Sequence, residues 1–534
     1  MKKITAYLLL VGFALCLSYI WLPHFFVTGD GPCHLYNAQV LHDLWVGKNV
    51  AFYDRFYTLA YQPNPNWLST FVLAILLFAV NGVLAEKIFL SCYVILYIVG
   101  FYLLIKKIRP NATYLPLLVL LFVFPHTMSK GFYNFSFSVA FYFWVVWSWL
   151  RFLDKRNIGN ALLFFLFMLL IFFTHLLAFG FAAFTCAALV VSYAVANGQA
   201  ERGHSGFFLK NILWLCLMLA PFVILMQWFT QKEGGLQLQL SPHLYRLVEL
   251  AQYKYLVNVT HTEVPFAFIA GIAVLLLFLV SMLRFGSRPV INKYDGFLLS
   301  FLFVLFVYLF FPEDFLGRLI LITMRVQIFV FIIMACCVAY MLPPGKLEGT
   351  GSLILFMCFV GLSIFRISCL LSASDGVADY VSGIDNIKPY SVVLPLDFSP
   401  GGKDRHGKPI GDRNWLFTHA AEYMSTEKPL IFLDNYEANM GYFPISWNKG
   451  VNPYNYLSKY EGIEGQPPYA DIDEYQRTTG VIIDYILMWC YDPRFLLSEH
   501  FSAFYHQVNS EYHMVYTSPN NRTILLERNQ LAGR

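Results

Sequence analysis

Charge is scarce in this sequence: only 13% of its 534 residues are Asp, Glu, Lys or Arg. Soluble domains carry about 25% charged residues. Hydrophobic residues make up 58% of the chain. This composition excludes an ordinary soluble protein and predicts a polytopic α-helical membrane protein. The net charge of +4 is small, and we predict no nucleic-acid partner.

Several common motifs are also missing. The short basic loops contain no Walker-type or GxGxxG pattern, so no nucleotide-binding site is predicted there. Eight of the ten cysteines lie in apolar runs, where cysteine acts as a small hydrophobe. Cys33 and Cys490 lie outside these runs and provide neither a disulfide framework nor a metal-type spacing. No small-x-small cleavage site follows the first apolar run, which we interpret as an uncleaved first span.

The apolar runs predict the membrane topology, because a spanning helix needs about 20 apolar residues. We predict eleven spans, with 11–13 compatible with the pattern. They lie at 5–26, 88–105, 113–125, 136–150, 159–174, 176–196, 208–229, 264–283, 296–311, 319–342 and 350–371. Placing the basic clusters on the cytoplasmic side makes 67–84 a juxtamembrane helix. The alternative is a full span at 67–84 together with one additional crossing.

Two domains are predicted from the change in composition near residue 372. Residues 1–372 form the transmembrane domain, with an outer loop at 27–87, and residues 373–534 form a soluble α/β domain on the non-cytoplasmic face. Strands are predicted at 391–397, 429–434, 481–491, 511–517 and 522–527, and helices at 414–424 and 493–507. Trp415, His419 and Tyr423 recur at four-residue spacing, which we interpret as one packing face of a helix.

The first outer loop contains Asp30-Gly-Pro-Cys-His34-Leu-Tyr36-Asn-Ala38. Placing an ionisable group at a membrane is costly and suggests a functional site. The pattern resembles the first outer loop of the GT-C superfamily, which includes protein O-mannosyltransferases and aminoarabinose transferases. The family theme is an Asp, often followed by Glu, then a spacer, an aromatic residue and an Ala-x-x-Leu helix. Gly31 occupies the second acidic position, and the overall layout is also similar to that of the family.

The resemblance implies a glycosyltransferase with a GT-C-like fold. It would move a sugar from a polyprenyl-phosphate donor to a lipid, glycan or protein acceptor, with inversion. Asp30 is the predicted general base, and partial burial would raise its pKa. Asp30 could instead cap the following helix, and the two roles can coexist. His34 is predicted to assist the base, contact phosphate or bind metal; its alternative role is local hydrogen bonding.

Cationic residues are predicted to hold the departing phosphate. Arg318 and Arg325 lie seven residues apart on one helical face, and arginine can grip phosphate through two hydrogen bonds. Their alternative role is an ion pair with Glu313, Asp314 or another acid. Lys130, in the second outer loop, either neutralises phosphate or extends to the lipid headgroups.

Four further residues are predicted to contact substrate: Tyr36, Tyr133, Asn134 and His175. The second outer loop contains no Asp or Glu, and Asn134 stands near the place where relatives carry an acid. We therefore predict no metal ligand or other cofactor, and a divalent metal is disfavoured. The expected location is the bacterial inner membrane, in contact with membrane lipid, with the C-terminal domain in the periplasm. A transporter or flippase of a lipid-linked sugar, or a polysaccharide polymerase or ligase, remains an alternative.

Overall fold

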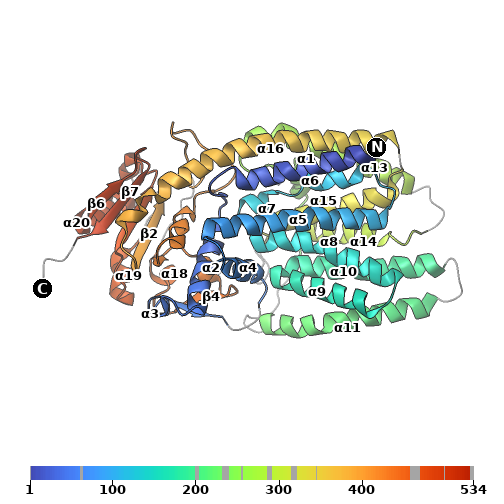
Figure 1. Ribbon diagram of the computed structural model, residues 1–534, viewed down its shortest axis with the longest axis horizontal. Coiled ribbons are helices and arrows are strands. Elements are labelled where there is room, and N and C mark those ends of the chain that lie inside the picture. The colour runs from blue at the N-terminus through green and yellow to red at the C-terminus, as the bar shows by residue number, and fades with distance from the viewer. Residues whose placement is uncertain are drawn as a thin grey trace.

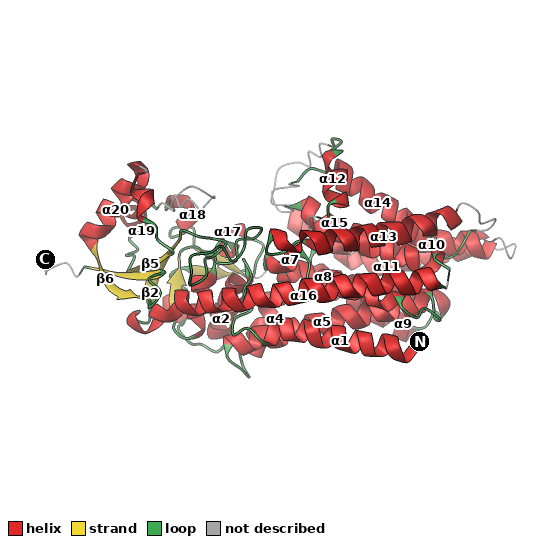
Figure 2. Cartoon of the chain, turned by 90° about the horizontal axis from the view of Figure 1, so that it is seen from above, coloured by secondary structure: helices red, strands yellow, loops and turns green. Residues whose placement is uncertain are grey.

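The computed structural model describes residues 2–529, apart from 61–63, 199–203, 231–239, 254–255, 286–290, 314–320, 344, 458–469 and 498. Most of the helices lie side by side in an elongated bundle, and the strands gather at one end of it (Figure 1). Helix α1 (Lys2–Trp21) begins at the end of the bundle that lies far from the strands (Figure 2).

Eight helices in the described part of the chain are long and apolar enough to cross a membrane. They are α1 (Lys2–Trp21), α5 (Gly82–Ile108), α8 (Tyr133–Asp154), α10 (Leu176–Gly198), α11 (His204–Thr230), α13 (Val264–Phe285), α15 (Ile322–Met341) and α16 (Lys346–Tyr380). Each coincides with one of the spans predicted from the sequence. The chain is therefore a helical membrane protein with eight candidate spans.

The other three predicted spans fall on shorter apolar helices. These are the segment Leu115–Ser129, α9 (Ile158–Thr174) and α14 (Gly296–Phe310). The first is broken into η1 (Leu115–Leu117), α6 (Leu118–Leu121) and α7 (His126–Ser129). After the break, α7 brings His126, Thr127 and Ser129 beside the first outer loop, where the Gly29 N–H donates to the Ser129 carbonyl at 3.2 Å.

The ambiguous segment 67–84 contains α4 (Leu68–Leu76), a helix of 9 residues. At 1.5 Å per residue it is about 13 Å long, well short of the roughly 30 Å hydrocarbon core of a bilayer. The next helix, α5, begins at Gly82, where the Asn81 side chain accepts a hydrogen bond from the Leu84 backbone N–H at 2.9 Å. Helix α4 is therefore too short to cross a bilayer, and the juxtamembrane position of 67–84 stays a prediction.

Helix α16 connects the bundle to the C-terminal region. It has 35 residues and is about 52 Å long, so it extends beyond the membrane thickness. Near its end, the Asp379 carboxylate accepts a hydrogen bond from Arg522 Nε at 2.9 Å, and the Asp379 backbone carbonyl accepts one from the Thr523 hydroxyl at 2.9 Å. These bonds attach the sheet directly to the end of the helix.

The C-terminal region contains a five-stranded mixed sheet in the order β3-β2-β5-β7-β6. The strands are β2 (Ser391–Asp397), β3 (Leu430–Phe432), β5 (Tyr485–Trp489), β6 (Tyr512–Thr517) and β7 (Thr523–Arg528). Strand β2 is parallel to both β3 and β5, and all its residues are buried. This agrees with an apolar run covered on both faces. The predicted α/β domain therefore contains the strands expected from the sequence.

The outer loop and the C-terminal region are joined by a second sheet. Strand β1 (Tyr57–Leu59) pairs antiparallel with β4 (Ile445–Trp447), and Tyr57 lies opposite Trp447. The two regions predicted as separate domains therefore share a hydrogen-bonded sheet. The loop preceding α5 is thereby held against the segment that follows β3.

The predicted helix over 414–424 is wrong. Turns lead into a 3₁₀ helix, η5 (Ala420–Thr426). The Ala420 N–H donates to the Phe417 carbonyl and the Glu422 N–H to the His419 carbonyl, both at 3.0 Å, which is the i→i−3 pattern of a 3₁₀ helix. The remaining elements are α2 (Gly31–Trp45), α3 (Val50–Tyr53), α12 (Tyr245–Ala251), η3 (His261–Glu263), η4 (Val381–Asn386), α17 (Glu437–Met440), α18 (Pro453–Tyr456), α19 (Ile472–Thr479), η6 (Pro493–Leu497) and α20 (Glu499–Glu511).

Candidate active site

A cavity of about 250 Å³ lies where the two outer loops, the membrane helices and the C-terminal region meet. It brings together six residues that the sequence singled out: Asp30, His34, Lys130, Asn134, His175 and Arg325. The first outer loop also contributes Asn66, and the C-terminal region contributes Asn414, Trp415, Thr418, His419 and Tyr436. Among the described residues that line the cavity, Asp30 carries the single carboxylate.

Backbone hydrogen bonds fix Asp30 against the second outer loop. The Asp30 N–H donates to the Lys130 carbonyl at 2.8 Å, and the Gly29 N–H donates to the Ser129 carbonyl at 3.2 Å. Gly131 makes this close approach feasible, because a Cβ there would lie 2.4 Å from the Gly31 nitrogen. The two loops predicted to carry the site therefore meet through their backbones.

The Asp30 side chain does not cap α2, although Asp30 occupies the N-cap position. Thr28 takes that role, because its hydroxyl oxygen accepts a hydrogen bond from the Gly31 N–H at 3.1 Å. The Asp30 carboxylate instead accepts a hydrogen bond from the Tyr436 hydroxyl at 2.8 Å. The capping alternative for this carboxylate is therefore wrong, and Asp30 faces the cavity.

The surroundings of Asp30 favour its protonated form more than water does. Burial raises the pKa of the Asp30 carboxyl above its usual range, while His419, the Tyr436 hydroxyl and His34 oppose that rise. A carboxylate with a raised pKa is a stronger base than a solvated one. The predicted direction of the pKa shift therefore agrees with the structure.

Glu437 holds the ring of His34 in place. The His34 Nδ1 lies 2.6 Å from Glu437 Oε1, and the ring stacks on Tyr133 with 5.3 Å between centroids. Burial disfavours the imidazolium, but the Glu437 carboxylate and then Asp30 more than offset this, so the pKa of His34 is raised. The protonated form of His34 beside Asp30 is therefore favoured more than it would be in water.

Lys130 and Arg325 bring positive charge to the same cavity. The Arg325 guanidinium lies over the ring of Phe132 at 4.5 Å, and Lys130 Nζ lies 6.0 Å from the ring centroid of Trp415. Glu313, an ion-pair alternative for Arg325, lies 3.6 Å from Arg246 and accepts a hydrogen bond from the Thr323 hydroxyl. Arg318 lies outside the residues that the structure describes.

Asn134 and His175 reach the cavity but also hold the backbone around it. The Asn134 side chain accepts from the Ser69 N–H and donates to the Asn66 carbonyl, both at 2.9 Å. The Nδ1 atom of His175 accepts a hydrogen bond from the Leu177 N–H at 3.3 Å. Both residues therefore position the segments around the cavity.

Tyr36 and Tyr133 do not line the cavity. Both are fully buried. The Tyr36 hydroxyl donates to the Leu430 carbonyl at 3.1 Å, which joins α2 to β3. The Tyr133 hydroxyl donates to the Glu86 carboxylate at 2.7 Å. The structure places these two tyrosines behind the cavity wall, rather than in contact with the space inside.

Sequence reasoning missed the contribution of the segment after β3. The Tyr436 hydroxyl donates to Asp30, Glu437 pairs with His34, and the Asn37 amide donates to Glu437 Oε2 at 2.8 Å. Polar residues at the carboxyl end of a parallel strand often form a site. The run Asp434-Asn-Tyr-Glu437, directly after the apolar strand, was a signal for this one.

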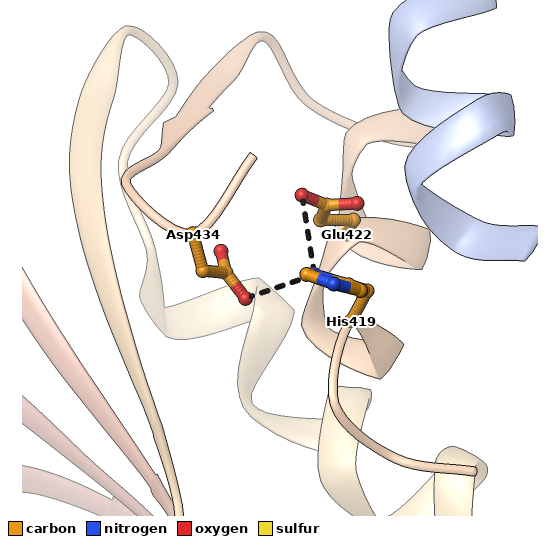
Figure 3. A group of neighbouring side chains, drawn as sticks. All are labelled: His419, Glu422 and Asp434. Carbon is orange, nitrogen blue, oxygen red and sulfur yellow. Dashed lines mark ion pairs between the residues drawn. The ribbon is translucent and has the colours of Figure 1, made fainter. Parts of the chain in front are cut away.

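Trp415 and His419 line the cavity, and their interpretation as one packing face of a helix is wrong. His419 stacks on Tyr436 with 5.1 Å between ring centroids. Its Nδ1 faces Asp434 and Glu422 (Figure 3). Burial disfavours the imidazolium, but the two carboxylates more than offset this and raise the pKa of His419 to about 10.

Buried Glu86 connects three segments behind the cavity. Its carboxylate accepts hydrogen bonds from Tyr133 at 2.7 Å and from Tyr423 at 2.9 Å. The Tyr423 side chain comes from η5 and Tyr133 from the start of α8, while Glu86 lies on α5. Glu86 therefore fixes the C-terminal region against the membrane helices, a role that the sequence did not reveal.

Searches for relatives find no matching protein-family model and no matching curated protein.

Proposed function

We propose that this chain is a membrane glycosyltransferase of GT-C type. It transfers a sugar from a polyprenyl-phosphate-linked donor to a hydroxyl group of a lipid, glycan or protein acceptor. One observation carries the proposal: a single cavity is lined by the carboxylate of Asp30 and by the cationic groups of Lys130 and Arg325. The reaction needs a base and a phosphate-binding group facing one substrate.

The chemistry follows from these roles. The acceptor hydroxyl oxygen attacks the anomeric carbon while Asp30 removes its proton. The bond between the anomeric carbon and the phosphate oxygen breaks, and its electron pair leaves with the polyprenyl phosphate. Arg325 and Lys130 stabilise the negative charge of this leaving group. Attack from the face opposite the phosphate inverts the anomeric configuration.

His34 and Tyr436 act on Asp30 rather than on the sugar. The Tyr436 hydroxyl orients the carboxylate through its 2.8 Å hydrogen bond. His34, held by Glu437 at 2.6 Å, contributes positive charge that favours the ionised form of Asp30. A carboxylate must be ionised before it can accept a proton. These two contacts therefore keep Asp30 able to accept the proton of the acceptor hydroxyl.

The proposal includes the orientation of the chain. Basic residues cluster in the loops at the opposite end of the bundle from the sheet region, and such clusters usually face the cytoplasm. The cavity would then open on the non-cytoplasmic face. In a bacterial cell, the chain would lie in the inner membrane and its C-terminal region in the periplasm.

A transfer assay tests the proposed activity. Membranes containing the wild-type chain are incubated with a panel of radiolabelled polyprenyl-phosphate sugars, and label is measured in lipid, glycan and protein fractions. Asp30→Asn should reduce transfer by about 10²–10⁴-fold, the usual contribution of a general base. Asp43→Asn is the matched control, because Asp43 lies on the same helix but is bonded to Gln39 and Asn49. The control should retain transfer.

The alternatives give different results in the same experiment. A transporter or flippase would move the labelled lipid across the membrane without creating a new glycosidic bond. A polymerase or ligase would place label only in a long glycan. Equal transfer by wild type and Asp30→Asn would remove Asp30 as the base.

A further inference from the structure

A second group of ligand-type side chains lies next to the cavity, which it reaches through His419. His419 precedes η5, Glu422 lies within η5, and Asp434 follows β3, so two separate segments supply the group. All three residues are buried. Figure 3 shows both carboxylates directed toward the imidazole of His419.

The spacing within this group is wider than that of hydrogen bonds. The His419 Nδ1 lies 3.6 Å from Asp434 Oδ2 and 4.0 Å from Glu422 Oε1. Hydrogen bonds between nitrogen and oxygen are about 2.7–3.2 Å long. Two ligands each about 2.1 Å from one Zn²⁺ in tetrahedral geometry lie roughly 3.4 Å apart. The three ligand atoms lie within 4.8 Å of one another, so a small contraction brings them onto one ion.

Glu422 provides an independent indication that a cation is needed. Its side chain is 0% exposed, and the neutral donor beside its carboxylate is the thiol of Cys33. The Nδ1 atom of His419 is also buried and lies 3.6 Å from the Asp434 carboxylate. A buried carboxylate is costly without strong compensating partners, and a thiol donor together with a histidine at 4.0 Å compensates only part of that cost.

We propose that His419, Glu422 and Asp434 bind a divalent transition-metal ion, preferentially Zn²⁺. One imidazole nitrogen and two carboxylate oxygens form a ligand set suited to Zn²⁺, whereas Mg²⁺ favours oxygen ligands alone. The two carboxylates supply two negative charges, which the ion balances. Binding requires the proton on Nδ1 to leave, so the metal replaces that proton in the cluster.

The ion would join the two segments that complete the cavity. Asp434 lies two residues before Tyr436, which donates to Asp30, and His419 stacks on the Tyr436 ring. Holding His419 and Asp434 together would therefore fix Tyr436 and, through it, the carboxylate of Asp30. The proposal concerns a structural site next to the cavity, and metal binding can be measured whether or not the chain is a glycosyltransferase.

Metal content of the purified full-length chain tests the site. The chain is prepared in detergent without a polyhistidine tag, stripped with a chelator, incubated with Zn²⁺, Mn²⁺ or Mg²⁺, and freed of unbound ion. Elemental analysis should find about one Zn²⁺ per chain, less Mn²⁺ and no retained Mg²⁺. Zn²⁺ should also raise the unfolding temperature of the stripped chain, because it binds the folded state.

Variants identify the ligands. Glu422→Gln and Asp434→Asn should each lower Zn²⁺ retention at least about tenfold, in line with the loss of a metal ligand. Glu437→Gln is the matched control, since Glu437 is a buried acid in the neighbouring segment that pairs with His34. It should retain one Zn²⁺.

Binding to the wild-type chain keeps the test decisive if a variant does not fold. Co²⁺ bound by the stripped wild-type chain should give the visible absorption of a low-symmetry site with nitrogen and oxygen ligands, and Zn²⁺ should displace it. Failure of the wild-type chain to retain Zn²⁺ or Co²⁺ overturns the proposal. Retention by a folded Glu422→Gln chain at the wild-type level overturns it equally.

Discussion

Gly131 offers a sharp test of how Asp30 is positioned. Its φ is +85°, and a Cβ at this position would lie 2.4 Å from the Gly31 nitrogen and 2.5 Å from the Asp30 nitrogen. The obstructing atoms belong to the backbone, so they cannot rotate away. Gly131→Ala must therefore displace the Asp30–Gly31 backbone, whose Asp30 N–H bonds the Lys130 carbonyl at 2.8 Å.

Gly131→Ala should have two measurable effects, a loss of stability and a loss of transfer rate. A left-handed backbone conformation costs a residue with a Cβ about 1–2 kcal/mol. Relieving a 2.4 Å contact also requires a displacement on the order of 1 Å, and a misplacement of this size in a catalytic site can reduce the rate about 10²-fold. We expect Gly131→Ala to show both effects, a lower unfolding temperature and a loss of transfer of about 10²-fold.

Gly407→Ala is the control that separates the backbone conformational cost from the displacement of Asp30. Gly407 has a φ of +77°, but a Cβ there meets no atom within 4 Å. This variant should show the conformational cost alone, with wild-type transfer of radiolabelled sugar. Unfolding is followed in detergent by intrinsic fluorescence on matched preparations. The positioning role of Gly131 is refuted if Gly131→Ala matches Gly407→Ala in both stability and transfer.

Two further predictions concern buried polar groups around the cavity. Glu86→Gln should lower the unfolding free energy by about 1–3 kcal/mol, because the amide has one accepting oxygen, whereas the carboxylate accepts the Tyr133 and Tyr423 hydroxyl protons on separate oxygens. Exposed Glu427→Gln serves as its control in chemical denaturation, and an equal loss in both variants contradicts the role of Glu86. The raised pKa of His34 predicts a stabilisation that is fully present below its unfolded pKa of about 6.5 and is lost as pH rises through the higher folded pKa. Glu437→Gln should flatten this dependence of unfolding temperature on pH, and an unchanged slope argues against the pair.

Much of the membrane architecture could be predicted, because long apolar runs have few alternatives to spanning a bilayer. The candidate base was proposed from the sequence because Asp30 is an acid directly after a span, with Lys130 in the second outer loop and Arg325 in a later apolar span. The gathering of Asp30, Lys130 and Arg325 around one cavity agrees with that reasoning.

The contribution of the C-terminal region could not be read from spacing alone. Tyr436 and Glu437 reach Asp30 and His34 across more than 400 positions of sequence. The polar run after β3 indicates a site at that strand end, but it does not identify the residues that it contacts. His419 was misinterpreted because its four-residue spacing from Trp415 suggested a helix. The Phe417 and His419 carbonyls instead accept the i→i−3 hydrogen bonds of a 3₁₀ helix, and His419 lines the cavity.

Tyr36 was predicted to contact substrate, but it lies outside the cavity. Its place in the Asp30 motif suggested substrate contact, but α2 turns its side chain away from the cavity toward β3, where its hydroxyl bonds the Leu430 carbonyl. A helix directs neighbouring residues to different faces. Residues of one short motif can therefore have separate roles, here at the cavity and in the core.

The most direct test of the central claim measures donor binding and sugar transfer in the same preparation of Asp30→Asn. If Asp30 is the base, the variant should bind the labelled polyprenyl-phosphate sugar with wild-type affinity, because Lys130 and Arg325 remain in the cavity. Its transfer rate at saturating donor should fall by about 10²–10⁴-fold. Wild-type transfer by a variant that binds the donor normally would contradict the account.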